Sequence, residues 1–560
     1  MRNRDQVSGV SFQESTNRTQ TSNFHPERVL PAPRFWRPGK AQTLRVSKGH
    51  DFSRAKGMAE RRRALVPEGR ICTCSLIAAG LLIASIAAPS ALPAQQSKPW
   101  EQIPIPALHA FHPQQPKRIE IKNGIVIFLQ EDHELPFISG SVLIPGGSRD
   151  VDPSKAGLIG LYGQAWRTSG TEKMDGDAMD DLLEAKAAHI ETAGDEDSTA
   201  VSWDSLKGDA DQVFSLAMDL LFHPKFDAGK LQLAQQQEAT SIVRRNDSED
   251  EIAERESAKL VYGVNSPYTR QPELSTIAAV SLDDLQAWHD RTLKGKLIVG
   301  IGGDFDSAAW ESKLRATFEN LPSVTPEPPR HDQFPGPTPG LYFIDKEDVN
   351  QSNVQICGIG VDRRNPEVPA IAVMNEILGG GFGSRLFQKV RTQLGLAYAV
   401  GGGFSLDYDH PGAFRVEVLT KSASTVDATK AAQAEIAGLL SKPFTDEELK
   451  RAKDDILSSF LFRYDTKDKV LAERERLEFY GYPADYLETY QAGLEKVTLA
   501  DVTAVTKKYI HPDRLAVLVV GNGPEIKPGL DALDMGAPKP IDITIPRPTG
   551  TPFAAGGAEK

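Results

Sequence analysis

The sequence is poor in cysteine and lacks the short motifs of several common enzyme classes. Only three of its 560 residues are cysteines, which excludes a disulfide framework. Two of them fall before residue 95, and the third, Cys357, lies in an apolar run where we predict a buried strand residue. The chain contains no Gly-x-Ser-x-Gly elbow and no Gly-x-x-x-x-Gly-Lys-Ser/Thr loop. Nothing therefore indicates an α/β-hydrolase or a P-loop nucleotide-binding protein.

Most of the chain also lacks an excess of positive charge. The first 94 residues carry 15 Lys and Arg against 6 Asp and Glu, whereas the remaining residues carry 49 against 70. A nucleic-acid groove needs a basic footprint, so the acidic body argues against nucleic acid as a partner. The 40% hydrophobic and 25% charged residues are typical of a folded soluble protein, which excludes a disordered chain or one with many membrane spans.

The N-terminal segment has the pattern of an export signal. Residues 1–57 are polar and without periodicity, so we expect a disordered extension or a wrongly assigned start. Arg61 to Arg63 then precede the apolar stretch Cys74–Ala88 of 15 residues, and a small-residue cleavage site follows at Ala94. This pattern predicts a cleavable signal peptide over 58–94. A membrane-spanning helix needs about 20 apolar residues, so we expect a periplasmic or secreted protein without a membrane anchor.

The rest of the chain contains one unit twice. The run Val280–Leu285 returns as Val497–Val502, and Leu297–Gly303 returns as Leu515–Gly521. Both copies predict a helix, a short connector and a buried strand that ends at glycine. Asn123-Gly124, between two alternating runs, predicts a β-hairpin.

The helical pattern and the proline content set the predicted architecture. Long amphipathic helices are expected at 175–188, 210–221, 228–245, 425–440 and 446–461. Strands and helices occur in clusters rather than in strict alternation, which predicts an α+β fold with two homologous domains, each a mostly antiparallel sheet packed with helices. Seven prolines between Leu321 and Gly340 predict a semi-rigid spacer. The predicted parts are an N-terminal extended segment (95–117), a first domain (118–320), a linker (321–340), a second domain (341–525) and a Pro/Gly-rich tail (526–560).

Four motifs of the two copies recur in one known family. The first copy contains Ala156-Gly157-Leu158, Ser169-Gly170-Thr171 and Ala187–Thr192, and the second contains the more specific stretch Leu378–Tyr398. With these motifs the chain resembles the pitrilysin-type (inverzincin, insulinase-like) zinc peptidases, which include insulin-degrading enzyme and mitochondrial processing peptidase. The resemblance spans about residues 115–525 and implies two homologous α+β domains that form half of a clamshell.

The resemblance also points to a metal site that this sequence has lost. Active members carry His-x-x-Glu-His on a helix, in which the histidines bind zinc and the Glu is the general base; a distant Glu is the third protein ligand. Aligned on the first motif, the histidine positions are Gly160 and Gln164, the general-base position is Gly163, and the distant ligand position is Ser241. No His-x-x-Glu-His or His-Glu-x-x-His occurs in the chain. The resemblance therefore implies that this chain binds no zinc or other cofactor.

The substrate-holding part of the family's site is retained. Active members use an Arg and a Tyr seven residues apart, and Arg391 and Tyr398 match that spacing. A phenol can donate to an oxyanion, and a guanidinium can hold a carbonyl or carboxylate. The alternative is an ordinary salt bridge for Arg391 and a core position for Tyr398. A neighbouring glycine-rich segment consists of Gly380, Gly381, Phe382 and Gly383. It resembles the substrate-contacting glycine-rich loop of the non-catalytic processing-peptidase subunit. A helix C-cap followed by a tight turn explains the segment equally well.

A lost metal site beside a retained Arg/Tyr pair resembles the zinc-free partner in two-subunit bacterial members of the family. It implies a non-catalytic, substrate-binding subunit of a periplasmic heterodimeric zinc metallopeptidase that acts on unfolded peptides. Arg391 and Tyr398 would complete the site of a homologous partner that carries His-x-x-Glu-His and the zinc. The peptide would be held as an added strand at a sheet edge. The alternatives are a metal-free peptide-binding or assembly protein with no catalytic partner, and an autonomous peptidase with unusual ligands.

Overall fold

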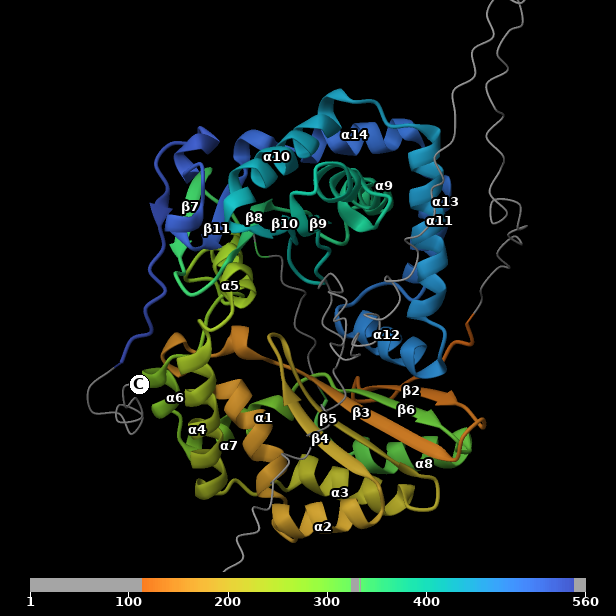
Figure 1. Ribbon diagram of the computed structural model, residues 1–560. Helices are drawn as coiled ribbons and strands as arrows, with labels where there is room; N and C mark the ends of the chain where they lie inside the picture. Colours follow the sequence, from red (N-terminus) through yellow and green to blue (C-terminus); the bar gives the residue numbers. More distant parts are fainter. Residues whose placement is uncertain (1–112, 324–331, 333, 548–560) are drawn as a thin grey trace, which may run out of the picture. The chain divides into compact units, whose positions relative to one another are not determined.

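The computed structural model describes residues 113–323, 332 and 334–547 (Figure 1). The predicted extension 1–57 and signal peptide 58–94 lie outside the described residues, as do most of the extended segment and parts of the linker and tail. In the described part of the chain, no helix is both long enough and apolar enough to cross a bilayer.

The first part of the chain forms a six-stranded sheet with the order β1-β2-β6-β3-β5-β4. Only β2 and β6 run parallel; the other neighbours are antiparallel. The predicted hairpin is confirmed, since β1 pairs with β2 and Gly124 adopts a φ of 85°. The strands are β1 (Lys117–Glu120), β2 (Val126–Glu131), β3 (Phe137–Pro145), β4 (His189–Gly194), β5 (Ser198–Leu206) and β6 (Ile298–Gly303).

The second part forms another six-stranded sheet, with the order β12-β7-β11-β8-β10-β9. Its last five strands repeat the order and directions of β2-β6-β3-β5-β4, so the duplication predicted from the sequence is present in the topology. The sixth strand, β12, comes from the predicted tail and pairs parallel with β7. The strands are β7 (Gly340–Asp345), β8 (Gln351–Ile359), β9 (Ala397–Phe404), β10 (Ala413–Lys421), β11 (Ala516–Gly521) and β12 (Lys539–Pro540).

Helices pack against both sheets, which confirms the α+β class. The five helices expected from the sequence all form, within a few residues of their predicted bounds. The first part contains α1 (Leu158–Ser169), α2 (Gly176–Ala185), α3 (Ala210–Phe222), α4 (Ala228–Arg244), α5 (Glu249–Tyr262), α6 (Leu274–Ala278), α7 (Leu282–Thr292) and α8 (Ser307–Phe318). The second contains α9 (Val368–Asn375), α10 (Thr425–Ser441), α11 (Asp446–Arg463), α12 (Lys467–Phe479), α13 (Tyr486–Lys496) and α14 (Leu499–Tyr509).

The repeated sequence runs form equivalent structures. Helices α7 and α14 both begin with a capping box, Ser281 with Asp284 and Thr498 with Asp501, in which each side chain accepts from the other residue's backbone N–H. Each helix then leads to the buried central strand of its sheet, β6 or β11. On β8, Cys357 is fully buried, as predicted.

Each sheet is also covered by a helix from the other part of the chain. Helix α5 packs on β8 and β11, and Asn353 on β8 donates to Asp250 at 2.8 Å. Helix α12 packs on β2 and β6, and Ser141 on β3 donates to Glu475 at 2.9 Å. The helices occupy equivalent positions in the repeat, directly after α4 and α11. The two homologous parts therefore exchange helices.

Candidate functional site

The first helix of the first sheet carries three of the four positions at which the family holds its metal and general base. Gly160 is exposed on α1, with nothing within 4 Å of a Cβ placed there. Gln164, one turn later, donates from Nε2 to Oε1 of Gln237 on α4. The α4 residue that faces Gln164 is thus Gln237, one helical turn before the exposed Ser241. Gln164, at a position where the resemblance implies a metal ligand, is thus hydrogen-bonded to another amide.

The general-base position, Gly163, is closed by the edge strand of the same sheet. A Cβ at Gly163 would lie 3.0 Å from the backbone nitrogen of Gly194 and 3.2 Å from the carbonyl carbon of Ala193. Thr192 donates from its hydroxyl to the Gly163 carbonyl oxygen, which holds β4 against α1. A glutamate at this position has no room without a shift of β4. Among the described residues, no group of three or more His, Cys, Asp or Glu side chains is placed to hold a metal ion.

Arg391 and Tyr398 lie on the surface of the second part, next to each other. Arg391 is in η5 (Phe387–Gln393), a π-helical segment, and a turn at Gly395 with a φ of 64° leads into β9, where Tyr398 is 67% exposed. The guanidinium carbon of Arg391 lies 5.8 Å from the centroid of the Tyr398 ring. Tyr398 is therefore not a core residue, and Arg391 has no ion pair within the described part of the chain.

Two phenylalanines extend this pair into a row. The guanidinium carbon of Arg391 lies 4.7 Å from the centroid of the Phe387 ring, within cation–π range. Phe387 in turn packs edge-to-face on Phe382, with centroids 4.9 Å apart at 80°. Phe382 is 67% exposed. We call Phe382, Phe387, Arg391 and Tyr398 the aromatic–arginine row.

The glycine-rich segment presents Phe382 to this row. The π-helical turn η4 (Glu376–Gly380) ends at Gly380, and a Cβ on that residue or on Gly381 would meet the Glu376 side chain. Arg451 on α11 donates to the carbonyl oxygen of Gly383 at 3.0 Å. The segment is thus a helix end and a tight turn that leave Phe382 exposed. Burial beneath it raises the pKa of Glu376.

Sequence reasoning missed the residues that shape this surface. Phe387 precedes Arg391 by four residues on a helix, a spacing that places two side chains on one face, so a signal was present. Arg451 and Gln388 carry no such signal. Arg451 reaches the loop from a distant helix, and Gln388 donates from Nε2 to the Phe382 carbonyl oxygen at 2.6 Å.

The edge of the second sheet is closed along part of β9. Asn375 donates to the carbonyl oxygen of Phe404 and accepts from its N–H, both at 2.9 Å, as a partner strand would. A Cβ on Gly379 would lie 2.5 Å from the carbonyl oxygen of Gly402. These contacts close β9 to an added strand near Gly402 and Phe404, whereas Tyr398 lies toward the other end of the strand.

Comparisons with known proteins find similarity to M16 peptidases and their inactive homologues. Residues 279–456 match the family model described as the peptidase M16 inactive domain. The chain is 24% identical over 406 residues to a Helicobacter pylori (strain ATCC 700392 / 26695) protein named non-peptidase homolog YmxG, covering 71% of this chain and 92% of that protein. It is 21% identical over 419 residues to a Bacillus subtilis (strain 168) protein named uncharacterized zinc protease YmxG, covering 73% and 98%.

Solved structures show the same fold. A peptidase M16 inactive domain from Pseudomonas fluorescens aligns with a TM-score of 0.65 at 23% identity, covering 73% of this chain and 98% of that one. A protease from Helicobacter pylori aligns with a TM-score of 0.63 at 17% identity, covering 73% and 100%. The match of residues 279–456 to the M16 inactive domain agrees with the pitrilysin-type resemblance seen in the sequence, and the solved structures share the fold over 73% of the chain.

Proposed function

We propose that the chain is the non-catalytic, substrate-binding subunit of a heterodimeric zinc metallopeptidase. In this proposal it is exported through the signal peptide at 58–94 and works in the periplasm on unfolded peptides. A homologous partner that carries His-x-x-Glu-His holds the zinc and the general base. This chain supplies Arg391 and Tyr398 to the partner's site.

The observation that carries the proposal is the exposure of the aromatic–arginine row. Tyr398 and Phe382 are each 67% exposed, although large aromatic side chains are usually much more buried. Exposed apolar surface with an arginine at its centre is typical of a recognition surface, where aromatic and arginine side chains contribute most of the binding energy. The proposal places the metal in the partner, because the positions that the resemblance aligns with the metal ligands and the general base are Gly160, Gly163, Gln164 and Ser241 in this chain.

The chemistry of the row suits a peptide undergoing hydrolysis. Attack of zinc-bound hydroxide on a peptide carbonyl develops negative charge on the oxygen, and a phenol O–H can donate to that oxygen. The guanidinium of Arg391 can hold a neighbouring carbonyl or a terminal carboxylate. Phe382 and Phe387 offer apolar contact to the side chains of an unfolded substrate. The substrate backbone would pair as an added strand at the Tyr398 end of β9.

Reconstitution with the proposed partner tests the function. The mature chain is produced together with a homologous His-x-x-Glu-His chain from the same genome, and the two are purified through a tag on one of them. We expect a stable complex that cleaves an unfolded peptide, whereas each chain alone is inactive. Failure to form a complex, with peptide binding by this chain alone, would favour the metal-free binding or assembly protein.

A further inference from the structure

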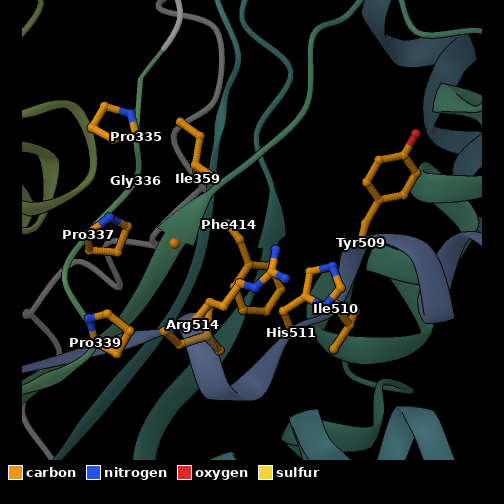
Figure 2. A pocket seen from close by; sticks show the side chains of 12 residues that line it. Pro335, Gly336, Pro337, Pro339, Ile359, Phe414, Tyr509, Ile510, His511 and Arg514 are labelled. Atoms are coloured by element: carbon orange, nitrogen blue, oxygen red, sulfur yellow. The ribbon is translucent and has the colours of Figure 1, made fainter.

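A cavity lies where the described end of the Pro-rich linker meets the second sheet (Figure 2). Its volume is about 320 Å³. That is near the lower end of the range of small-ligand pockets, about 300–1,000 Å³, and suits a ligand of the size of one amino-acid residue. Pro335, Pro337 and Pro339 line one side, and Ile359 of β8 and Phe414 of β10 line the opposite side.

Two nitrogen-bearing side chains reach this cavity from the segment after α14. Arg514, at the end of η7 (Pro512–Arg514), is exposed, and its guanidinium has no hydrogen-bond or ion-pair partner among the described residues. His511 is oriented by its Nε2, which donates to the Lys508 carbonyl oxygen at 3.0 Å and leaves Nδ1 as the unused nitrogen. Figure 2 shows the Arg514 side chain reaching toward Phe414 and His511. No acidic side chain lines the cavity.

We propose that this cavity binds the terminal carboxylate of an apolar amino-acid residue, as found in an N-acyl amino acid or at the C-terminus of a peptide. Arg514 holds the carboxylate through its two-pronged guanidinium. Nδ1 of His511 accepts the hydrogen bond of the residue's amide N–H. Phe414, Ile359 and the prolines contact the apolar side chain. The aromatic–arginine row contributes nothing to the cavity, so the proposal stands independently of a catalytic partner.

Calorimetric titration of the mature chain with N-acetyl-L-phenylalanine tests the site, and the corresponding amide serves as the uncharged control. A ligand of this size that fits the cavity should bind with a Kd on the order of 0.1–1 mM. We expect the amide to bind at least about tenfold more weakly, because it lacks the charge that Arg514 pairs with. The variant Arg514→Gln should lose a similar factor for the acid and leave the amide unchanged. Arg244→Gln, an exposed arginine on α4, is the control that should change nothing.

Competition with the peptide Ala-Ala-Ala-Phe distinguishes the two sources of the carboxylate. Displacement of N-acetyl-L-phenylalanine by the peptide supports the site and assigns peptide C-termini to it. Binding of the small acid without displacement supports the site and assigns free N-acyl amino acids. Equal affinity for acid and amide, no effect of Arg514→Gln, or no heat of binding at about 10 mM acid would each overturn the proposal.

Discussion

In both homologous parts of the molecule, glycines allow a helix to pack closely against the edge strand of the sheet, but the consequence for the surface differs. In the first part, α1 meets the edge strand β4 through Gly163 and Gly194, and a Cβ on Gly194 would lie 2.7 Å from the carbonyl oxygen of Ile159. In the second part, η4 meets the edge strand β9 through Gly379 and Gly402. The first contact fills the place of a catalytic side chain. The second ends short of Tyr398 and leaves the aromatic–arginine row exposed.

The covering helices differ in a second way. Helix α5 buries Glu256 beside Arg255 and Lys259, at 2.8 and 2.9 Å. Helix α12 buries Glu475 against β6, where its carboxylate has no ion pair among the described residues. The side chain accepts a hydrogen bond from Ser141 and fills the space above Gly300. Helix α12 also buries Glu473, which lies 3.5 Å from Arg476, so both helices bury a paired carboxylate and α12 buries Glu475 in addition. This comparison predicts that the two parts respond differently to substitution and to pH.

The largest expected effect follows from loss of the Tyr398 hydroxyl. In the reconstituted pair, Tyr398→Phe should lower kcat by roughly 10²–10³, or about 2.7–4 kcal/mol of transition-state stabilisation. The melting temperature should not change, because the side chain is exposed. Steady-state kinetics and thermal unfolding measure both, and Tyr342→Phe on β7 is the matched control. A normal kcat for Tyr398→Phe would mean that the exposed tyrosine has no part in catalysis.

The next largest expected effect is a dependence of folding stability on pH, which is caused by Glu475. Burial raises its pKa to about 7, with Ser141 and Arg476 opposing this and Asp468 adding to it. The folded protein therefore binds a proton more tightly than the unfolded chain. The stability from this group is complete below about pH 4.5 and is lost as pH rises through 7. The loss is on the order of 3 kcal/mol.

Glu475→Gln should remove this dependence, so that the variant is more stable than the parent at pH 8 and the difference disappears at pH 4.5. Urea unfolding at several pH values measures the effect, and Glu495→Gln, an exposed glutamate on α13, should leave the profile unchanged. A parallel shift of the whole profile would instead mean that only packing had changed.

A smaller effect on stability distinguishes the glycines of α1. Gly163→Glu should cost about 1–3 kcal/mol, because the new side chain must displace the backbone of β4. Gly160→Ala, at the open position three residues earlier, should gain about 0.5–1 kcal/mol through helix propensity. Chemical unfolding of the two variants measures the difference. Equal stability would show that β4 moves away easily and that the general-base position is not closed.

The smallest effect concerns the loop that presents Phe382. Arg451→Ala removes the hydrogen bond to the Gly383 carbonyl and should cost about 1 kcal/mol of stability. The loosened loop should raise KM of the pair more than it lowers kcat. Lys450→Ala, the exposed neighbour on α11, is the control. An unchanged KM would remove the loop from substrate binding.

Much of this architecture was predictable from the sequence, because it depends on local patterns. The hairpin at Asn123-Gly124, the capping boxes of α7 and α14, and the buried glycine-ended strands each follow from residues close together in the chain. Their repetition predicted two similar sheets. The proximity of Arg391 and Tyr398 is also local, since the two residues lie seven apart, and their role in catalysis stays a prediction based on the resemblance.

The remaining features depend on contacts between distant residues and have no local signal. Gln164 contacts Gln237, which lies 73 residues further along the chain and one helical turn before Ser241, and spacing alone does not reveal this contact. The closure of Gly163 needs the position of β4. The exchange of α5 and α12 between the sheets, and the pairing of β12 within the predicted tail, both require the assembled fold.

Metal analysis of the reconstituted pair tests the central claim most directly, namely that this chain supplies the substrate-holding part of the site and not the metal. Zinc is measured in each purified chain and in the complex after dialysis against a mild chelator. The account predicts about one zinc per complex, all of it carried by the chain with His-x-x-Glu-His. Zinc retained in stoichiometric amount by this chain alone would contradict it.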